Sequence, residues 1–172
     1  GITSKTLDSN SEFRLVFKDD AIKNDFTKIR ILCKRNPYSF DLKVSAGNES
    51  KEIDIFNESQ DSLTDEIIVK LDSGYSEYKF SIVSRDTLQT SFEIYGLSFE
   101  SESDRGVLYT SVGINGAGHY SILRENLLPR QLKILNPDAI ILDVGANDFY
   151  QRGMDIPTFK DNLISIIDLF KK

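Results

Sequence analysis

This chain of 172 residues is poor in the residue types that build metal centres and covalent frameworks. It has one cysteine, Cys33, one histidine, His119, one methionine and no tryptophan. A single cysteine excludes an internal disulfide, and its alternation with Ile29 and Ile31 predicts a small buried hydrophobe. One cysteine and one histidine also argue against a dedicated transition-metal site.

Long apolar runs are also missing. No run approaches the roughly 20 residues that a membrane helix needs, and the first residues, 1–5, lack the apolar core of a signal peptide. We therefore expect no membrane span. The net charge of −6 comes from the first 104 residues, whereas the rest of the chain is close to neutral. This acidic segment is a poor candidate for binding nucleic acid, and we expect no nucleic-acid partner.

What the first part of the chain does have is a hydrophobic pattern of period two. It predicts seven short strands separated by turn sequences such as Asn-Pro, Gly-Asn and Ser-Gly. The alternating apolar residues are Phe13, Leu15 and Phe17; Ile29, Ile31 and Cys33; Phe40, Leu42, Val44 and Ala46; Ile53 and Ile55; Ile67, Val69 and Leu71; Tyr78, Phe80 and Ile82; Phe92 and Ile94. This spacing predicts an antiparallel β-sandwich, of jelly-roll or similar type, over residues 1–103.

The pattern changes at about residue 104. Two apolar runs, 106–112 and 139–144, predict buried parallel strands. A helical stretch that Pro129 breaks or restarts lies between them, and Asp155 with Pro157 marks the start of a last helix. Strand–helix–strand–helix predicts part of a flavodoxin-like α/β domain over residues 104–172. Two strands do not complete such a sheet, so we expect further segments to complete it, or the sandwich to cover it.

Each predicted strand of this second segment ends in a glycine-containing turn. Gly113 follows the first strand, and Gly145-Ala146-Asn147-Asp148 follows the second. At the carboxyl ends of parallel strands, the Gly113 N–H and the Asn147 amide can point at one place, as in an oxyanion hole. The alternative is that both are ordinary turn residues, with glycine for positive φ and Asn-Asp for capping.

These turns resemble two conserved blocks of the SGNH (GDSL) hydrolases. Ser111-Val112-Gly113-Ile114-Asn115-Gly116-Ala117 is similar to block II, and Gly145-Ala146-Asn147-Asp148 is similar to the Gly-x-Asn-Asp of block III. The resemblance covers residues 106–170. It implies that Gly113 and Asn147 are oxyanion donors, that a serine N–H is the third donor, and that no metal or organic cofactor is needed.

The catalytic residues of that family are absent from this chain. Neither the Gly-Asp-Ser of block I nor the Asp-x-x-His or Asp-x-His of block V occurs. In peptidoglycan O-acetylesterases of this family, a carbohydrate-binding-module-like sandwich lies between blocks I and II, which is the order seen here. The resemblance thus implies the middle of a periplasmic or cell-envelope serine esterase that acts on acetylated peptidoglycan, with the remaining SGNH segments outside this chain. We expect this chain alone to be inactive.

Two other classes stay open. In the first, the chain is a non-catalytic carbohydrate-binding module or a degenerate SGNH relative. In the second, it is an interaction or scaffold protein. For His119 a place at the surface or substrate edge, at the mouth of the cleft or on the first turn of a helix, is favoured over a general base. Ser39, Ser111 and Ser121 are nucleophile candidates in name only, because no Asp–His pair accompanies them. Asp148 is expected to brace its turn by hydrogen bonding rather than to act on substrate, and the same two roles are open to Asp143.

Aromatic and acidic side chains supply the remaining candidates. Phe149 and Tyr150 line a sugar cleft or belong to a core. On the sandwich, alternation places Phe40 and Tyr78 in the core, whereas Tyr38 and Tyr75 lie in turns and are the better ligand candidates. Asp61 and Asp65 offer a Ca²⁺ site, but a solvated loop is the favoured interpretation.

Overall fold

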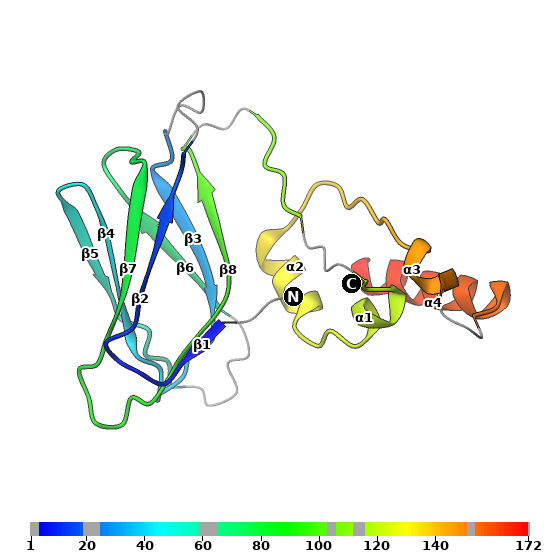
Figure 1. Ribbon diagram of the computed structural model, residues 1–172, viewed down its shortest axis with the longest axis horizontal. Helices are drawn as coiled ribbons and strands as arrows, with labels where there is room; N and C mark the ends of the chain where they lie inside the picture. The colour runs from blue at the N-terminus through cyan, green and yellow to red at the C-terminus, as the bar shows by residue number, and fades with distance from the viewer. Residues whose placement is uncertain are drawn as a thin grey trace. The chain divides into compact units, whose positions relative to one another are not determined.

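Two compact units make up the chain. The computed structural model describes residues 4–18, 25–58, 65–102, 106–111, 116–150 and 154–171. The first unit is Ile2–Tyr109 and the second is Thr110–Lys172. The first contains the strands and the second contains the helices (Figure 1).

The first unit is built from two four-stranded antiparallel sheets (Figure 1). One sheet has the order β1-β8-β3-β6, with β1 Ser4–Thr6, β8 Phe92–Glu100, β3 Lys28–Cys33 and β6 Asp65–Lys70. The other has the order β2-β7-β4-β5, with β2 Glu12–Val16, β7 Glu77–Val83, β4 Asp41–Ala46 and β5 Glu49–Ile53. Both sheets contribute to one core, as expected for a β-sandwich.

The residues that alternate in the sequence form this core. The cluster holds Ile29, Ile31, Cys33, Phe40, Leu42, Val44, Ala46, Ile55, Ile67, Val69, Leu71, Tyr78, Phe80, Ile82 and Phe92, all buried. Phe13 and Phe80 stack with ring centroids 4.6 Å apart and join the adjacent strands β2 and β7. The other alternating residues are only partly buried and pack against this cluster: Phe13, Leu15, Phe17, Ile53 and Ile94. Each predicted strand therefore has a counterpart, although some bounds differ, as in β5, which ends at Ile53, before Ile55.

One strand was not predicted. β1 consists of Ser4, Lys5 and Thr6 and pairs with the start of β8. It carries no apolar side chain, so no alternation marks it. It is held by backbone hydrogen bonds at the edge of a sheet whose apolar residues come from its neighbours.

The second unit contains four described helices. They are α1 His119–Leu123, α2 Leu128–Leu135, α3 Ala146–Tyr150 and α4 Ile156–Phe170. Asp155 caps α4 by accepting the Thr158 N–H at 2.8 Å, as its sequence predicts. Pro129 lies in the first turn of α2, so the expected break in the helical stretch is confirmed. Both α1 and α2 pack against α4.

Among the described residues, neither of the two parallel strands predicted in the second segment forms. Residues 107–111 and 139–144 pair with no strand among the described residues. Val107 is 94% exposed and Ile141 is 86% exposed. A parallel strand satisfies its backbone hydrogen bonds only by pairing with a neighbouring strand, and the described part of this segment supplies none.

No described helix is long and apolar enough to cross a membrane.

Candidate functional site

The Asn147 turn is the first candidate site. Gly145 adopts φ +120°, a conformation that favours glycine, and the chain then enters α3 directly. Asn147 is exposed, and its Nδ2 donates a hydrogen bond to the Ala117 carbonyl at 2.9 Å. An amide nitrogen carries two protons, so a second N–H remains for a ligand. Gly113, the other predicted oxyanion donor, lies outside the described residues.

Asp148 holds the turn together, as predicted. One carboxylate oxygen accepts the Gly145 N–H at 3.0 Å, and the other accepts the His119 N–H at 2.8 Å. Asp148 is only 1% exposed. These bonds tie the start of α3 to the start of α1, two segments that are 29 residues apart in the sequence.

His119 is not at the surface. It is the first residue of α1, within the predicted first turn of a helix, but it is 0% exposed. Its Nδ1 contacts the Asp148 carboxylate, and its Nε2 lies 2.6 Å from Nδ2 of Asn162 on α4. The Phe159 ring packs edge-on against it, with centroids 5.7 Å apart. The expectation of a surface position is wrong, because Asp148 and Asn162 satisfy the ring and allow its burial.

The remaining candidates of this unit do not join that cluster. Ser111 and Ser121 are exposed, and so is Asp143. Phe149 is 52% exposed and Tyr150 is 91% exposed, so neither is a core aromatic. The Phe149 ring does contact the Phe159 ring, at a centroid distance of 4.9 Å. Ser39, in the sandwich unit, is buried and bonded to the Lys34 carbonyl.

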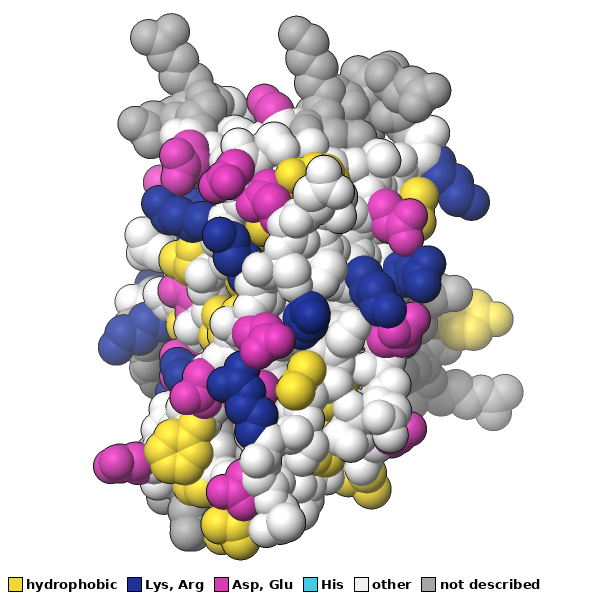
Figure 2. Space-filling view, turned by 90° about the vertical axis from the view of Figure 1, so that its left-hand side faces the viewer, with side chains coloured by type: hydrophobic (Ala, Val, Ile, Leu, Met, Phe, Trp, Pro, Cys, Tyr) yellow, Lys and Arg dark blue, Asp and Glu magenta, His cyan; other side chains and the backbone are white. Residues whose placement is uncertain are grey.

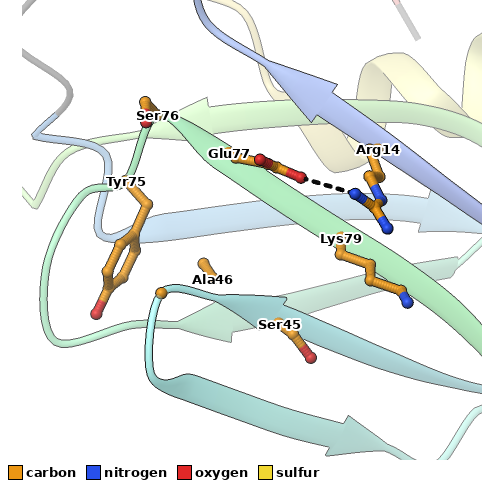
Figure 3. A pocket seen from close by; sticks show the side chains of 8 residues that line it. Arg14, Ser45, Ala46, Tyr75, Ser76, Glu77 and Lys79 are labelled. Carbon is orange, nitrogen blue, oxygen red and sulfur yellow. Dashed lines mark hydrogen bonds and ion pairs between the residues drawn. The ribbon is translucent and has the colours of Figure 1, made fainter.

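The second candidate site is a groove on the sandwich unit beside Tyr75. The groove has a volume of about 440 Å³. It is lined by Arg14 of β2, Glu77 and Lys79 of β7, Ser45 and Ala46 of β4, and Gly47, Tyr75 and Ser76. Figure 3 shows Tyr75 at one end and the Arg14 and Lys79 side chains toward the other.

Tyr75 is held in place from three sides. Its hydroxyl donates to Glu49 at 2.6 Å, which raises the pKa of Tyr75, and its N–H donates to the Tyr78 hydroxyl at 3.0 Å. Its ring lies so close to Gly47 that a Cβ there would be 2.3 Å from Cε1. Gly47 also has φ +54°. Glycine is therefore favoured there both because a side chain would collide with Tyr75 and because the backbone conformation suits glycine. Tyr75 is thus a fixed, half-buried wall of the groove.

The charges of the groove are balanced. Arg14 pairs with Glu77 at 3.4 Å and with Glu12 at 3.6 Å, and Lys79 pairs with Glu12 at 2.5 Å. Basic and acidic side chains also alternate over the side of the molecule in Figure 2. Such a surface offers donors and acceptors side by side without a strong field of either sign.

Comparison with solved structures finds a distant structural neighbour. The chain is similar to the C-terminal domain of EclA, a sugar-binding protein, with 12% identity and a TM-score of 0.31. The match covers 58% of this chain and 77% of that one. No family model and no curated protein matches the chain.

The other aromatic and acidic candidates of the sandwich unit that the structure describes do not line the groove. Phe40 and Tyr78 are core residues, as predicted, and Tyr38 is 43% exposed, away from the groove. Asp65 pairs with Arg35 at 3.3 Å, and Asp61 lies outside the described residues. Among the described residues no three His, Cys, Asp or Glu side chains are grouped to hold a metal ion. Burial raises the pKa of the Cys33 thiol to about 12, in keeping with the predicted buried hydrophobe.

Proposed function

We propose that the sandwich unit binds a carbohydrate in the groove beside Tyr75. The arrangement of that groove carries the proposal. A sugar presents hydroxyl groups around an apolar ring face. It therefore needs hydrogen-bonding partners for the hydroxyl groups and an aromatic or apolar surface for the ring face. The Tyr75 ring supplies an immobilised aromatic surface, which loses little conformational entropy on binding. Arg14, Lys79 and Glu77 supply charged donors and an acceptor, which make the stronger hydrogen bonds.

The balance of charge in the groove restricts the class of ligand that it can bind. Each cation of the groove has a carboxylate within 4 Å, so a polyanion gains little from binding there. We therefore propose a neutral, hydroxyl-rich glycan, such as the sugar backbone of peptidoglycan. Its binding should depend little on salt, because counterion release makes no large contribution.

Pull-down on insoluble peptidoglycan, followed by titration with an N-acetylglucosamine tetrasaccharide, tests this function. Arg14→Ala should weaken binding about tenfold, the typical loss of one charged hydrogen bond. Arg85→Ala is the matched control, because Arg85 is similarly exposed (48% against 56%) and is also paired with carboxylates, but it lies outside the groove. Equal binding by wild type and Arg14→Ala would exclude this groove as the sugar site.

A second function is favoured by the Asn147 turn. We propose that the second unit is the block II–block III part of an SGNH-type serine esterase of the periplasm or cell envelope, which removes O-acetyl groups from peptidoglycan. The exposed Asn147 amide supports this proposal. It is fixed by one N–H on Ala117 and has a second N–H free of that bond. The exposed apolar residues at 107–109 and 140–141 also suit strands whose partners belong to other segments.

In this mechanism a serine outside the chain attacks the acetyl carbonyl carbon and gives its proton to a histidine, also outside the chain. The carbonyl oxygen becomes an oxyanion, which accepts hydrogen bonds from Asn147 and from the Gly113 N–H. Collapse of the intermediate releases the sugar hydroxyl with the proton from histidine. Water then hydrolyses the acetyl-serine to acetate.

Steady-state kinetics on acetylated peptidoglycan, with the complete protein that contains this chain, tests the esterase. Asn147→Ala should lower kcat by roughly 10²–10³, the usual cost of one oxyanion donor. Asn10→Ala removes an exposed asparagine of the sandwich unit and should leave kcat unchanged. A loss under about tenfold for Asn147→Ala, with stability intact, would remove Asn147 from the oxyanion hole.

A further inference from the structure

A buried polar cluster underlies the Asn147 turn, and neither proposed function gives it a role. Its members are His119 of α1, Asp148 of α3 and Asn162 of α4. His119 and Asp148 are 0% and 1% exposed. Burying such groups costs free energy unless each is hydrogen-bonded, so a fully bonded cluster is a rigid one.

The contacts of the His119 imidazole are those expected of one tautomer, the one with a hydrogen on Nδ1. The Asn162 amide nitrogen can only donate, so Nε2 of His119 accepts its bond at 2.6 Å. Nδ1 then carries the hydrogen and donates a hydrogen bond to the Asp148 carboxylate. Both ring nitrogens are hydrogen-bonded and the ring is buried, so in this arrangement no nucleophile contacts it.

The cluster controls the position of Asn147 from both sides. Asn147 directly precedes Asp148, and its hydrogen-bond partner, the Ala117 carbonyl, lies two residues before His119. Asp148 joins these two segments by bonding the N–H groups of Gly145 and His119. Asn162 holds the far side of the imidazole and so prevents His119 from turning away from Asp148.

We propose that His119 and Asn162 are positioning residues for the Asn147 amide. This inference rests on the esterase proposal for its catalytic meaning, but the geometric claim stands separately. Asn162 fixes the orientation of His119 by a hydrogen bond. His119 and Asp148 then hold the Ala117 segment against α3, and this places the Asn147 amide with one N–H pointing outward. The tightness at Gly118 fits this role, because a Cβ there would lie 2.3 Å from the Asp148 carboxylate.

Side-chain ¹⁵N relaxation of Asn147 in the full 172-residue chain tests the geometric claim. In wild type the Asn147 side-chain amide should have an order parameter close to that of rigid backbone, about 0.85. Asn162→Leu keeps a similar volume but removes the donor, and the order parameter should fall below about 0.6. If Asn162→Leu does not fold, Asn162→Ala serves the same purpose. Ile166→Val, a buried change on α4 outside the cluster, is the control and should leave Asn147 rigid.

Kinetics of the complete protein test the catalytic meaning. Asn162→Leu should lower kcat about tenfold at unchanged KM. A misplaced Asn147 amide stabilises the oxyanion of the transition state less, whereas substrate binding in the ground state is unaffected. A rigid Asn147 in folded Asn162→Leu overturns the positioning proposal. Full activity of Asn147→Ala removes Asn147 from the oxyanion hole whatever its mobility, and no activity of the wild-type complete protein overturns the esterase, so these failures are distinguishable from a failure of the positioning proposal.

Discussion

At the scale of single residues, glycine at position 118 marks where the second unit is most tightly built. Gly118 has φ −107°, so its backbone accepts any residue, but a Cβ there would approach Asp148 to 2.3 Å. Gly118→Ala must therefore push the carboxylate away from the Gly145 and His119 N–H groups. Leaving buried polar groups unpaired costs roughly 1–3 kcal/mol each. We expect loss of the α1 and α3 amide signals in NMR spectra, with the sandwich signals unchanged.

The control for this prediction is Gly96→Ala in β8. The nearest atom to a Cβ at Gly96 is 4.0 Å away, which is ordinary contact, so this variant should fold like wild type. If Gly118→Ala keeps the α1 and α3 signals in place, the Asp148 bonds do not hold the turn.

At the scale of elements, a charged row crosses the outer side of one sheet from β6 through β3 to β8. Arg30 of β3 contacts Glu66 of β6 and donates to Glu100 of β8 at 2.8 Å, and Lys28 also pairs with Glu100. Burial by itself would raise the pKa of Glu100, but these hydrogen bonds and charges lower it to about 2. The ionised carboxylate therefore stabilises the pairing of β3 with β8.

Acid unfolding tests this row. A carboxyl group whose pKa is lower in the folded state stabilises above its ordinary pKa of 4.5, and the effect is lost as the pH falls from 4.5 toward 2. Glu100→Gln should lower the unfolding free energy at neutral pH by up to about 3 kcal/mol. It should also flatten the dependence of stability on pH below 4.5, as measured by urea titrations. Glu102→Gln, at an exposed ion pair with Lys70, should change little. Parallel pH profiles for wild type and Glu100→Gln would contradict the prediction.

The elements also show how far sequence reasoning reaches. The core strands were predictable because alternation reports which side of a strand is buried, and Asp148 was predictable as a brace because its partner Gly145 is three residues away. The helix start at Asp155 has a local signal too. The contact of His119 with Asn162 spans 43 residues, and no local pattern encodes it. The apolar runs near Val107 and Ile141 had the composition of buried strands, but pairing depends on neighbouring strands that the described residues do not provide.

At the scale of the whole molecule, the two units differ in how much core each contains. The main core cluster lies within residues 13–99, entirely inside the first unit. In the second unit, Ile166 is the one fully buried apolar side chain among the described residues, and many other apolar side chains are exposed. Because buried apolar area provides most of the folding free energy, the sandwich should be stable by itself and the second unit should be marginal.

A fragment of residues 1–109 tests this division. We expect it to keep a cooperative thermal transition, with its midpoint within about 5 °C of the sandwich transition in the full chain, because the fragment contains the whole core cluster. The helical signal of the full chain should disappear at a lower temperature than the sandwich signal, as followed by far-UV circular dichroism together with NMR of core methyl groups. A fragment of residues 110–172 is the companion sample and should show little cooperative structure. An unfolded 1–109 fragment, or coincident melting of both signals in the full chain, would mean that the stability of the sandwich depends on the second unit.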